Sequence, residues 1–165
     1  MLPPKLILAP IDFSDSSRAA LDVAADMSSR FGAELLLVHV VPAIPDLPED
    51  VSIFKEAEYD KSLGDSAAQQ LSGLAAALGH KNIRIRTEVG TANDIGMELV
   101  RIAEHNHVDM IIIATHGMTG WRRIAFGSVA EKVVKEAECP VLVLRSKAAE
   151  EGEQKNKSSF LAASE

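Results

Sequence analysis

The chain alternates between short apolar runs and longer segments in which apolar residues recur every three or four positions. Two runs, KLILAP at residues 5–10 and ELLLVHVV at residues 34–41, are nearly continuous, which is typical of strands covered on both faces. Between them the pattern predicts a helix that stops at Gly32. The apolar face of this helix is formed by residues spaced three or four apart: Ala20, Val23, Ala24, Met27 and Phe31.

The middle of the chain follows the same alternation. Residues 42–50, PAIPDLPED, contain three prolines and predict a loop. The Ala- and Leu-rich segment 53–78 predicts a long helix, interrupted near Gly64. IRIRTEV at residues 83–89 alternates apolar and polar side chains, so we expect a half-exposed strand at the edge of a sheet.

The last third of the chain adds two more predicted strands and two helices. TAND at residues 91–94 has the spacing of a capping box and opens a helix. The apolar face of that helix holds Ile95, Leu99 and Ile102. DMIIIAT at residues 109–115 predicts a fourth buried strand, PVLVLR at residues 140–145 a fifth, and residues 128–137 a helix between them.

This order of elements predicts an α/β fold, a doubly wound parallel sheet with helices on both faces. In such sheets the ligand crevice lies beyond the carboxyl ends of the strands, where the strand order reverses. The candidate ligand segments are therefore PIDFSD after the first strand, HVV at the end of the second and ATHG after the fourth.

The composition is that of an ordinary soluble globular protein: 165 residues, 47% hydrophobic and 25% charged. We expect one α/β domain over residues 1–146 and a polar, mobile tail over residues 147–165.

The charge, the apolar runs and the single cysteine exclude several classes of protein. The formal net charge of -7 argues against nucleic acid as a partner, because phosphate contacts need a basic surface. No apolar run approaches the roughly 20 residues that span a bilayer, so we expect no membrane partner. We expect no signal peptide in the first residues. The single cysteine, Cys139, fits a reducing compartment, and we predict a cytoplasmic protein.

The loop ATHGMTGWRRIAFGS, residues 114–128, carries the chemistry of an anion site. Gly117 and Gly120 can take a positive φ and let a ligand approach the backbone. Ser128 is a suitable N-cap, and Glu131 three residues later completes a capping-box spacing. The N–H groups of the first turn would then face the loop and attract a phosphate. A purely structural role, with Ser128 capping its helix and the glycines turning the chain, accounts for the same residues.

The end of the first strand offers a carboxylate but no standard phosphate motif. Neither G-x-x-x-x-G-K-[ST] nor G-x-G-x-x-G after the first strand occurs. Asp12 could accept a hydrogen bond from a ribose hydroxyl or an adenine amino group. Alternatively, Asp12 and Ser14 cap the first helix.

The quoted segments resemble one known family. Ala114-Thr115-His116-Gly117, nine further residues and Gly127-Ser128 are similar to the pattern G-x-x-G, nine residues, G-[ST] of the universal stress protein family, whose members bind ATP or AMP. ILAPIDFSDSSRAALDVA, LLLVHVV and GSVAEKVVKEAECPVLVLR also look like that family, so the resemblance covers roughly residues 3–146. It implies a Rossmann-like fold, similar to that of adenine nucleotide alpha hydrolases, with five parallel strands in the order 3-2-1-4-5.

The resemblance also implies a set of binding residues. Pro10, Ile11 and Asp12 would frame the adenine and ribose, and Val40 would contact adenine. The remaining residues would lie along the nucleoside and around the phosphates: Ile113, Ala114, His116, Gly117, Gly127, Ser128 and Val129.

The chain departs from the family pattern at two positions. Ala114 replaces the first glycine of the motif, so a methyl group narrows the approach of a ligand, while Ala130 stands where some members have a hydroxyl. The resemblance implies a homodimer joined through the last strand, from Pro140 to Arg145, which is also a strongly apolar strand at the end of the sheet.

The function predicted from these observations is that of a regulator or stress-response factor that holds ATP or AMP. We assign no catalytic residue and no metal site, and expect at most a slow ATPase with His116 as a weak general base. Magnesium would accompany ATP, although no pair of carboxylates marks its site. The alternative is a dimeric interaction module of the same fold that binds no nucleotide.

Overall fold

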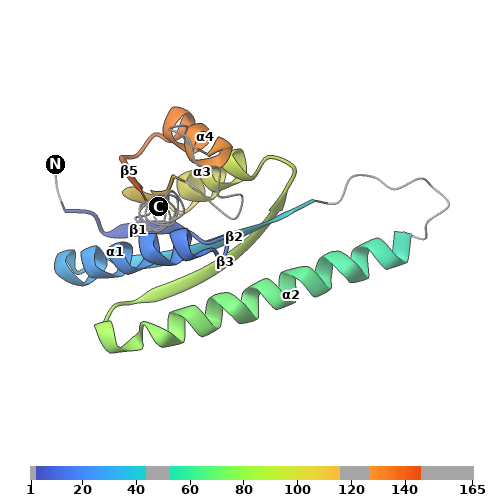
Figure 1. Ribbon diagram of the computed structural model, residues 1–165, viewed down its shortest axis with the longest axis horizontal. Helices are drawn as coiled ribbons and strands as arrows, with labels where there is room; N and C mark the ends of the chain where they lie inside the picture. Colours follow the sequence, from blue (N-terminus) through green and yellow to red (C-terminus); the bar gives the residue numbers. More distant parts are fainter. Residues whose placement is uncertain (1–2, 44–52, 116–126, 146–165) are drawn as a thin grey trace, which may run out of the picture.

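A computed structural model of the protein describes residues 3–43, 53–115 and 127–145, with the backbone alone at residues 53–61 and 80 (Figure 1). Most of the predicted proline-rich loop, the segment 116–126 and the predicted tail over residues 147–165 lie outside the described residues.

Five parallel strands form one sheet in the order β3-β2-β1-β4-β5. The strands are β1 (Leu6–Pro10), β2 (Glu34–Pro42), β3 (Ile85–Ala92), β4 (Met110–Ala114) and β5 (Val141–Leu144). In the register, Leu8 of β1 lies between Leu36 of β2 and Ile111 of β4. The predicted sheet order is confirmed, and β3 occupies the edge that its alternating pattern predicts.

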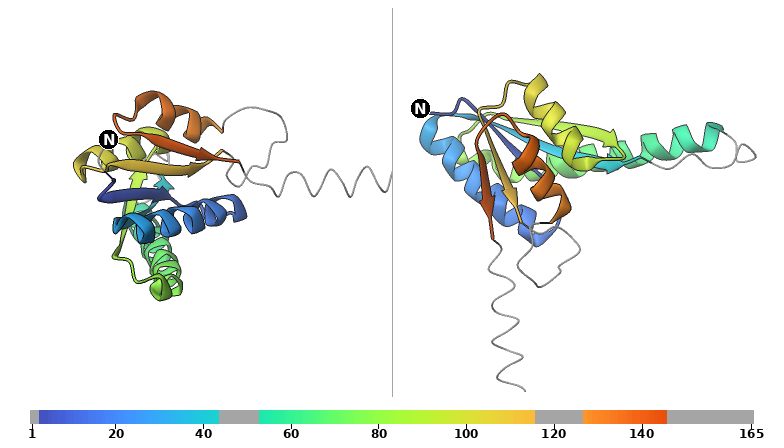
Figure 2. Two further views of the ribbon diagram at one scale, coloured as in Figure 1. Left: turned by 90° about the vertical axis from the view of Figure 1, so that its left-hand side faces the viewer. Right: turned by 90° about the horizontal axis from the view of Figure 1, so that it is seen from above.

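Helices cover both faces of the sheet. The elements are α1 (Asp15–Phe31), α2 (Ile53–Ala77), a short 3-10 turn η1 (Gly79–Lys81), α3 (Ile95–His105) and α4 (Ser128–Glu136). Helices α1 and α2 lie on one face and α3 and α4 on the other (Figures 1 and 2). Each of the central strands β2, β1 and β4 therefore buries alternate side chains in two separate cores.

The two cores account for the continuous apolar runs of the central strands. Toward α3 and α4 the sheet presents Leu8, Leu36, Val38 and Ile111, all buried. Toward α1 and α2 it presents Ile7, Leu35, Leu37 and Ile112, also buried. A strand that alternated apolar and polar side chains would leave one of these cores incomplete.

Helix α1 begins and ends at residues with clear capping roles. The Ser14 hydroxyl oxygen accepts a hydrogen bond from the Ser17 N–H at 3.2 Å. Gly32 ends the helix with φ of 68°, the left-handed conformation that glycine adopts without steric cost. The apolar face predicted for α1 is wrong at Phe31, which is 45% exposed. Compared with the predicted face, the buried face of the helix is rotated so that it includes Leu21, Ala25 and Ser28.

Two further predictions about helix ends and breaks are wrong. Helix α2 is continuous through Gly64, because a glycine within a helix costs only about 1 kcal/mol relative to alanine. Thr91 belongs to β3, and the N-cap of α3 is Asp94, whose carboxylate accepts from the Met97 N–H at 3.0 Å.

Candidate functional site

A crevice of about 310 Å³ opens at the carboxyl ends of β1, β2 and β4. The strand order reverses here, because β1 is followed along the chain by β2 on one side and lies beside β4 on the other. All the predicted site residues that the structure describes line this crevice: Pro10, Ile11, Asp12, Val40, Ile113, Ala114, Gly127, Ser128 and Val129. The predicted residues His116 and Gly117 lie outside the described residues.

The walls of the crevice are apolar. Val38 and Val40 come from β2, Ile113 from β4 and Leu99 from α3, and all four are buried. Val129 of α4 is half-buried beside them. An apolar slot of this kind accepts a flat aromatic group better than a strongly hydrated one.

The loop between β1 and α1 forms one rim of the crevice. The Asp12 carboxylate oxygen Oδ1 accepts from the Ser14 N–H at 3.1 Å and from the Ser14 hydroxyl at 2.6 Å. Asp12 thus supports the N-terminus of α1 and lines the crevice at the same time. The two roles weighed for Asp12 from the sequence are therefore compatible with each other.

His39 lies at the same rim; it falls in the candidate segment HVV, but the sequence analysis did not include it among the binding residues. Its Nδ1 is 2.6 Å from the Ile11 carbonyl oxygen, and its ring lies 4.7 Å from that of Phe13, centroid to centroid. His39 also lines the crevice. The available signal was a polar side chain within the apolar run at the end of the second strand, at a position where ligand residues gather.

The N-terminus of α4 forms the opposite rim. The Gly127 N–H donates to the Thr115 carbonyl at 2.7 Å, which brings the end of β4 next to the start of α4. Gly127 is the N-cap, with no side-chain cap, and the first intrahelical bond runs from the Glu131 N–H to the Gly127 carbonyl at 2.9 Å. The predicted capping box is therefore wrong: Ser128 is already the first helical residue.

Among the described residues, no side chain caps the first turn of α4. Glu131 pairs with Lys135 at 2.6 Å, four residues along, and not with the cap position. Within the described part of the chain, the N–H groups of Ser128, Val129 and Ala130 have no acceptor. All three residues line the crevice, and the positive end of the helix dipole favours an anion beside them.

Helix α3 is packed closely against this first turn of α4. A Cβ added at Gly96 would lie 2.7 Å from the Cβ and Cγ atoms of Lys132. The Lys132 ammonium is 3.3 Å from the Asp94 carboxylate. The backbone N–H of Met97, together with Lys132, holds the pKa of Asp94 below its ordinary value. The capping residue of α3 is thus also paired with a lysine of α4.

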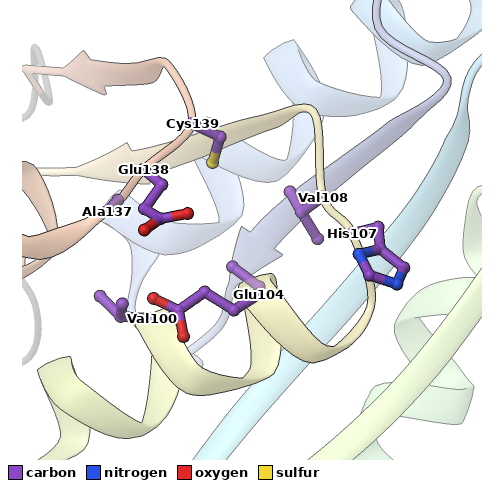
Figure 3. Close-up of a pocket in the computed structure, with 8 residues that line it drawn as sticks. Val100, Glu104, His107, Val108, Ala137, Glu138 and Cys139 are labelled. Carbon is purple, nitrogen blue, oxygen red and sulfur yellow. The ribbon is translucent and has the colours of Figure 1, made fainter.

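A second crevice, of about 250 Å³, lies at the opposite ends of the strands, between α3 and the segment before β5. Figure 3 shows the Glu104 and Glu138 carboxylates and the Cys139 thiol turned toward this space. Burial raises the pKa of the Cys139 thiol, which keeps it protonated and poorly reactive. The described residues contain no group of three or more His, Cys, Asp or Glu side chains that could hold a metal ion.

The crevice at β1, β2 and β4 therefore has the chemistry for an elongated ligand with two unlike ends. Its apolar walls fit an aromatic group, the Asp12 rim offers a carboxylate acceptor, and the α4 rim offers N–H donors for an anion. None of the helices in the described part of the chain has the length and apolar character needed to cross a membrane.

Comparison with known proteins identifies the family. The sequence pattern of the universal stress protein family matches residues 4–145. The chain belongs to the universal stress protein family. Within this family it is 36% identical to "Universal stress protein MJ0531" of Methanocaldococcus jannaschii over 143 residues, which are 86% of this chain and 82% of that protein.

Solved structures of the family share the fold. The structure of the protein MJ0577 has a TM-score of 0.75 and 28% identity, covering 89% of this chain and 99% of that one. A universal stress protein from Archaeoglobus fulgidus in complex with dAMP has a TM-score of 0.58 and 20% identity, covering 87% of this chain and 98% of that one. The five-stranded parallel sheet is thus the sheet of the family.

Proposed function

We propose that this universal stress protein binds an adenine nucleotide, ATP or AMP, in the crevice at the carboxyl ends of β1, β2 and β4. The observation that carries the proposal is the pairing of an apolar slot with an uncapped helix N-terminus at one end of it. A family member of the same fold in complex with dAMP, an adenine nucleotide, supports the choice of ligand by analogy.

The two rims give the ligand a direction. The adenine lies in the slot against Val40 and Ile113, and the ribose hydroxyls face Asp12. The phosphates lie at the first turn of α4, where the N–H groups of Ser128 and Val129 have no acceptor among the described residues. This direction places the anionic end of the ligand at the positive end of a helix dipole.

We further propose that nucleotide occupancy regulates the protein in a stress response. We assign no catalytic residue and expect at most slow hydrolysis of ATP. Magnesium would enter with ATP, held by the phosphates, since the described residues contain no group of three or more His, Cys, Asp or Glu side chains that could hold it. The cytoplasmic location expected from the single cysteine stays a prediction.

Isothermal titration tests the proposal directly. We expect ATP and AMP to bind with a stoichiometry of one per chain, and adenosine to bind more weakly because it lacks the phosphates. Inorganic phosphate serves as the control for anion binding without the base. The proposal fails if neither ATP nor AMP releases or absorbs heat at millimolar concentration, and native mass spectrometry shows no bound nucleotide.

A second candidate function is favoured by the edge strand β5. Its only neighbour in the described sheet is β4, and all four of its side chains are half-buried, while Val134 on the adjacent helix α4 is 44% exposed. We propose that two chains pair through this strand, from Pro140 to Arg145, as a homodimer. Without nucleotide binding, the protein would serve as a dimeric interaction module. A monomer at micromolar concentration in sedimentation would contradict the dimer.

A further inference from the structure

We propose that His39 is a positioning residue for nucleotide binding: it holds the β1–α1 loop in the conformation that receives the nucleoside. The inference rests on the proposed function and adds to it a residue on β2 that sets affinity for the base and ribose. Three observations carry it: a short hydrogen bond from His39 to Ile11, a ring contact of His39 with Phe13, and the unusual backbone conformation of Phe13.

The hydrogen bond defines the state of the imidazole. A carbonyl oxygen only accepts, so the His39 Nδ1, 2.6 Å from the Ile11 carbonyl, carries a proton and donates it. The Ile11 N–H in turn donates to the Val38 carbonyl at 2.8 Å. Both backbone polar groups of Ile11 are therefore tied to β2, at the last point before the chain leaves the sheet.

The ring contact acts on the other side of Asp12. Phe13 has φ of 63°, the left-handed region that a residue with a side chain rarely occupies. Its ring lies 4.7 Å from the His39 ring at an interplanar angle of 40°, a favourable tilted arrangement. His39 thus contacts the loop at Ile11 and at Phe13, and Asp12 lies between these two contacts.

The consequence for binding is preorganisation. Ser14 fixes the Asp12 carboxylate through two hydrogen bonds, while His39 fixes the backbone on either side of it. Ordering a loop on binding costs free energy and weakens affinity, and a loop that is already ordered avoids this cost. Removing the His39 donor should therefore raise the Kd values for adenosine, AMP and ATP by the same factor, because all three ligands contain the nucleoside.

Two amide variants separate the hydrogen bond from the mere presence of a polar side chain. Asparagine places its amide nitrogen close to the position of Nδ1, whereas glutamine places it farther out, near Nε2. We expect His39→Asn, which keeps the donor but lacks the ring that contacts Phe13, to raise the Kd for AMP by less than His39→Gln does. We expect His39→Gln to raise the Kd by about three- to tenfold, the effect of losing one hydrogen bond.

Two controls distinguish a specific loss of binding from a change of fold. His105 is exposed at the end of α3, away from the crevice, so His105→Gln should leave every Kd unchanged. Thermal unfolding of each variant checks that a loss of affinity occurs in a folded protein. Equal affinity of the Asn and Gln variants for AMP would overturn the inference. A variant that loses affinity for ATP but not for adenosine would also overturn it.

The tautomer of His39 gives a measurement that needs no ligand. Nitrogen-15 NMR should show a protonated Nδ1 on His39 at neutral pH; a proton on Nε2 alone would refute the hydrogen bond on which the inference depends. The failures are distinguishable. If the wild-type protein binds no adenine nucleotide, the proposed function fails and the inference with it; if it binds and His39→Gln binds equally well, only the inference fails.

Discussion

Replacing Ser128 with proline removes one backbone N–H from the proposed phosphate site without removing a hydrogen bond within the described protein. Ser128 is the first residue of α4, and its N–H has no acceptor among the described residues. Proline is favoured at the first helical position, where its fixed φ suits the helix. The preceding residue, Gly127, already has φ of -58° and ψ of 148°, the extended conformation that a following proline requires.

The magnitude follows from the charge of the ligand. A hydrogen bond to a charged group contributes about 1.5–3 kcal/mol, and about 1.4 kcal/mol corresponds to a tenfold change in Kd. Ser128→Pro should therefore raise the Kd for ATP and AMP by about ten- to a hundredfold. The Kd for adenosine should be unchanged, since adenosine has no phosphate. The unfolding free energy should stay the same or rise by about 0.4–1 kcal/mol, the usual effect of a proline at a compatible position.

The assay is isothermal titration of Ser128→Pro beside Ser128→Ala, which loses the hydroxyl but keeps the N–H. The alanine variant should bind ATP more tightly than the proline variant, and the two should bind adenosine alike. Equal Kd values of the two variants for ATP would refute the assignment of phosphates to the first turn of α4. A similar loss of affinity for adenosine in the Ser128→Pro variant would show that the substitution had altered the whole crevice.

Two further predictions concern the contact between α3 and α4, which positions the crevice. Gly96→Ala should lower the unfolding free energy by about 1–3 kcal/mol, because its methyl group would lie 2.7 Å from the Cβ and Cγ atoms of Lys132. Gly73 in α2 has open space around it, so Gly73→Ala should raise the unfolding free energy by up to about 1 kcal/mol. Urea unfolding of both variants checks this, and an equal effect of the two would contradict it. The folded state lowers the pKa of Asp94, chiefly through the Met97 N–H, so its contribution to stability is full above the ordinary aspartate pKa and is lost as pH falls through the lowered value. Asp94→Asn keeps a capping side chain and should make urea midpoints less sensitive to acid; identical pH profiles would show that Asp94 does not contribute.

The strands were accessible from the sequence because parallel strands are buried on both faces, whereas their order was implied by the resemblance to the universal stress protein family. KLILAP and DMIIIAT are apolar at nearly every position, and the structure covers both faces of β1 and β4 with helices. Such runs leave little ambiguity about which segments lie at the centre of the sheet. The alternating pattern of IRIRTEV was equally informative about the edge position of β3.

Helix ends were less predictable because several residues near each end can serve as the cap. Thr91 and Asp94 both have suitable side chains, and the continuation of β3 through Ala92 decides for Asp94. At α4, Ser128 has the capping-box spacing with Glu131, yet the hydrogen bond from Gly127 to Thr115 places the cap one residue earlier. Such contacts between distant segments are absent from the local pattern that sequence reasoning uses.

The candidate site was predicted from the resemblance and the strand ends, and the described members of the predicted set share one crevice. His39 was not selected, because a histidine within an apolar strand gives no indication of its hydrogen-bond partner. Its contact is with Ile11, the residue directly after β1, which only the register of β1 and β2 brings into reach.

The most direct test of the central claim is an NMR titration of the ¹⁵N-labelled protein with ATP. Nucleotide binding at the proposed site predicts saturable shifts of the amide signals of Ser128, Val129 and Ala130, together with those of Ile11 and Val40 across the crevice. Adenosine should shift the Ile11 and Val40 signals and leave the three α4 signals close to their free positions. No shift at these five amides, or shifts confined to the second crevice around Cys139, would contradict the account.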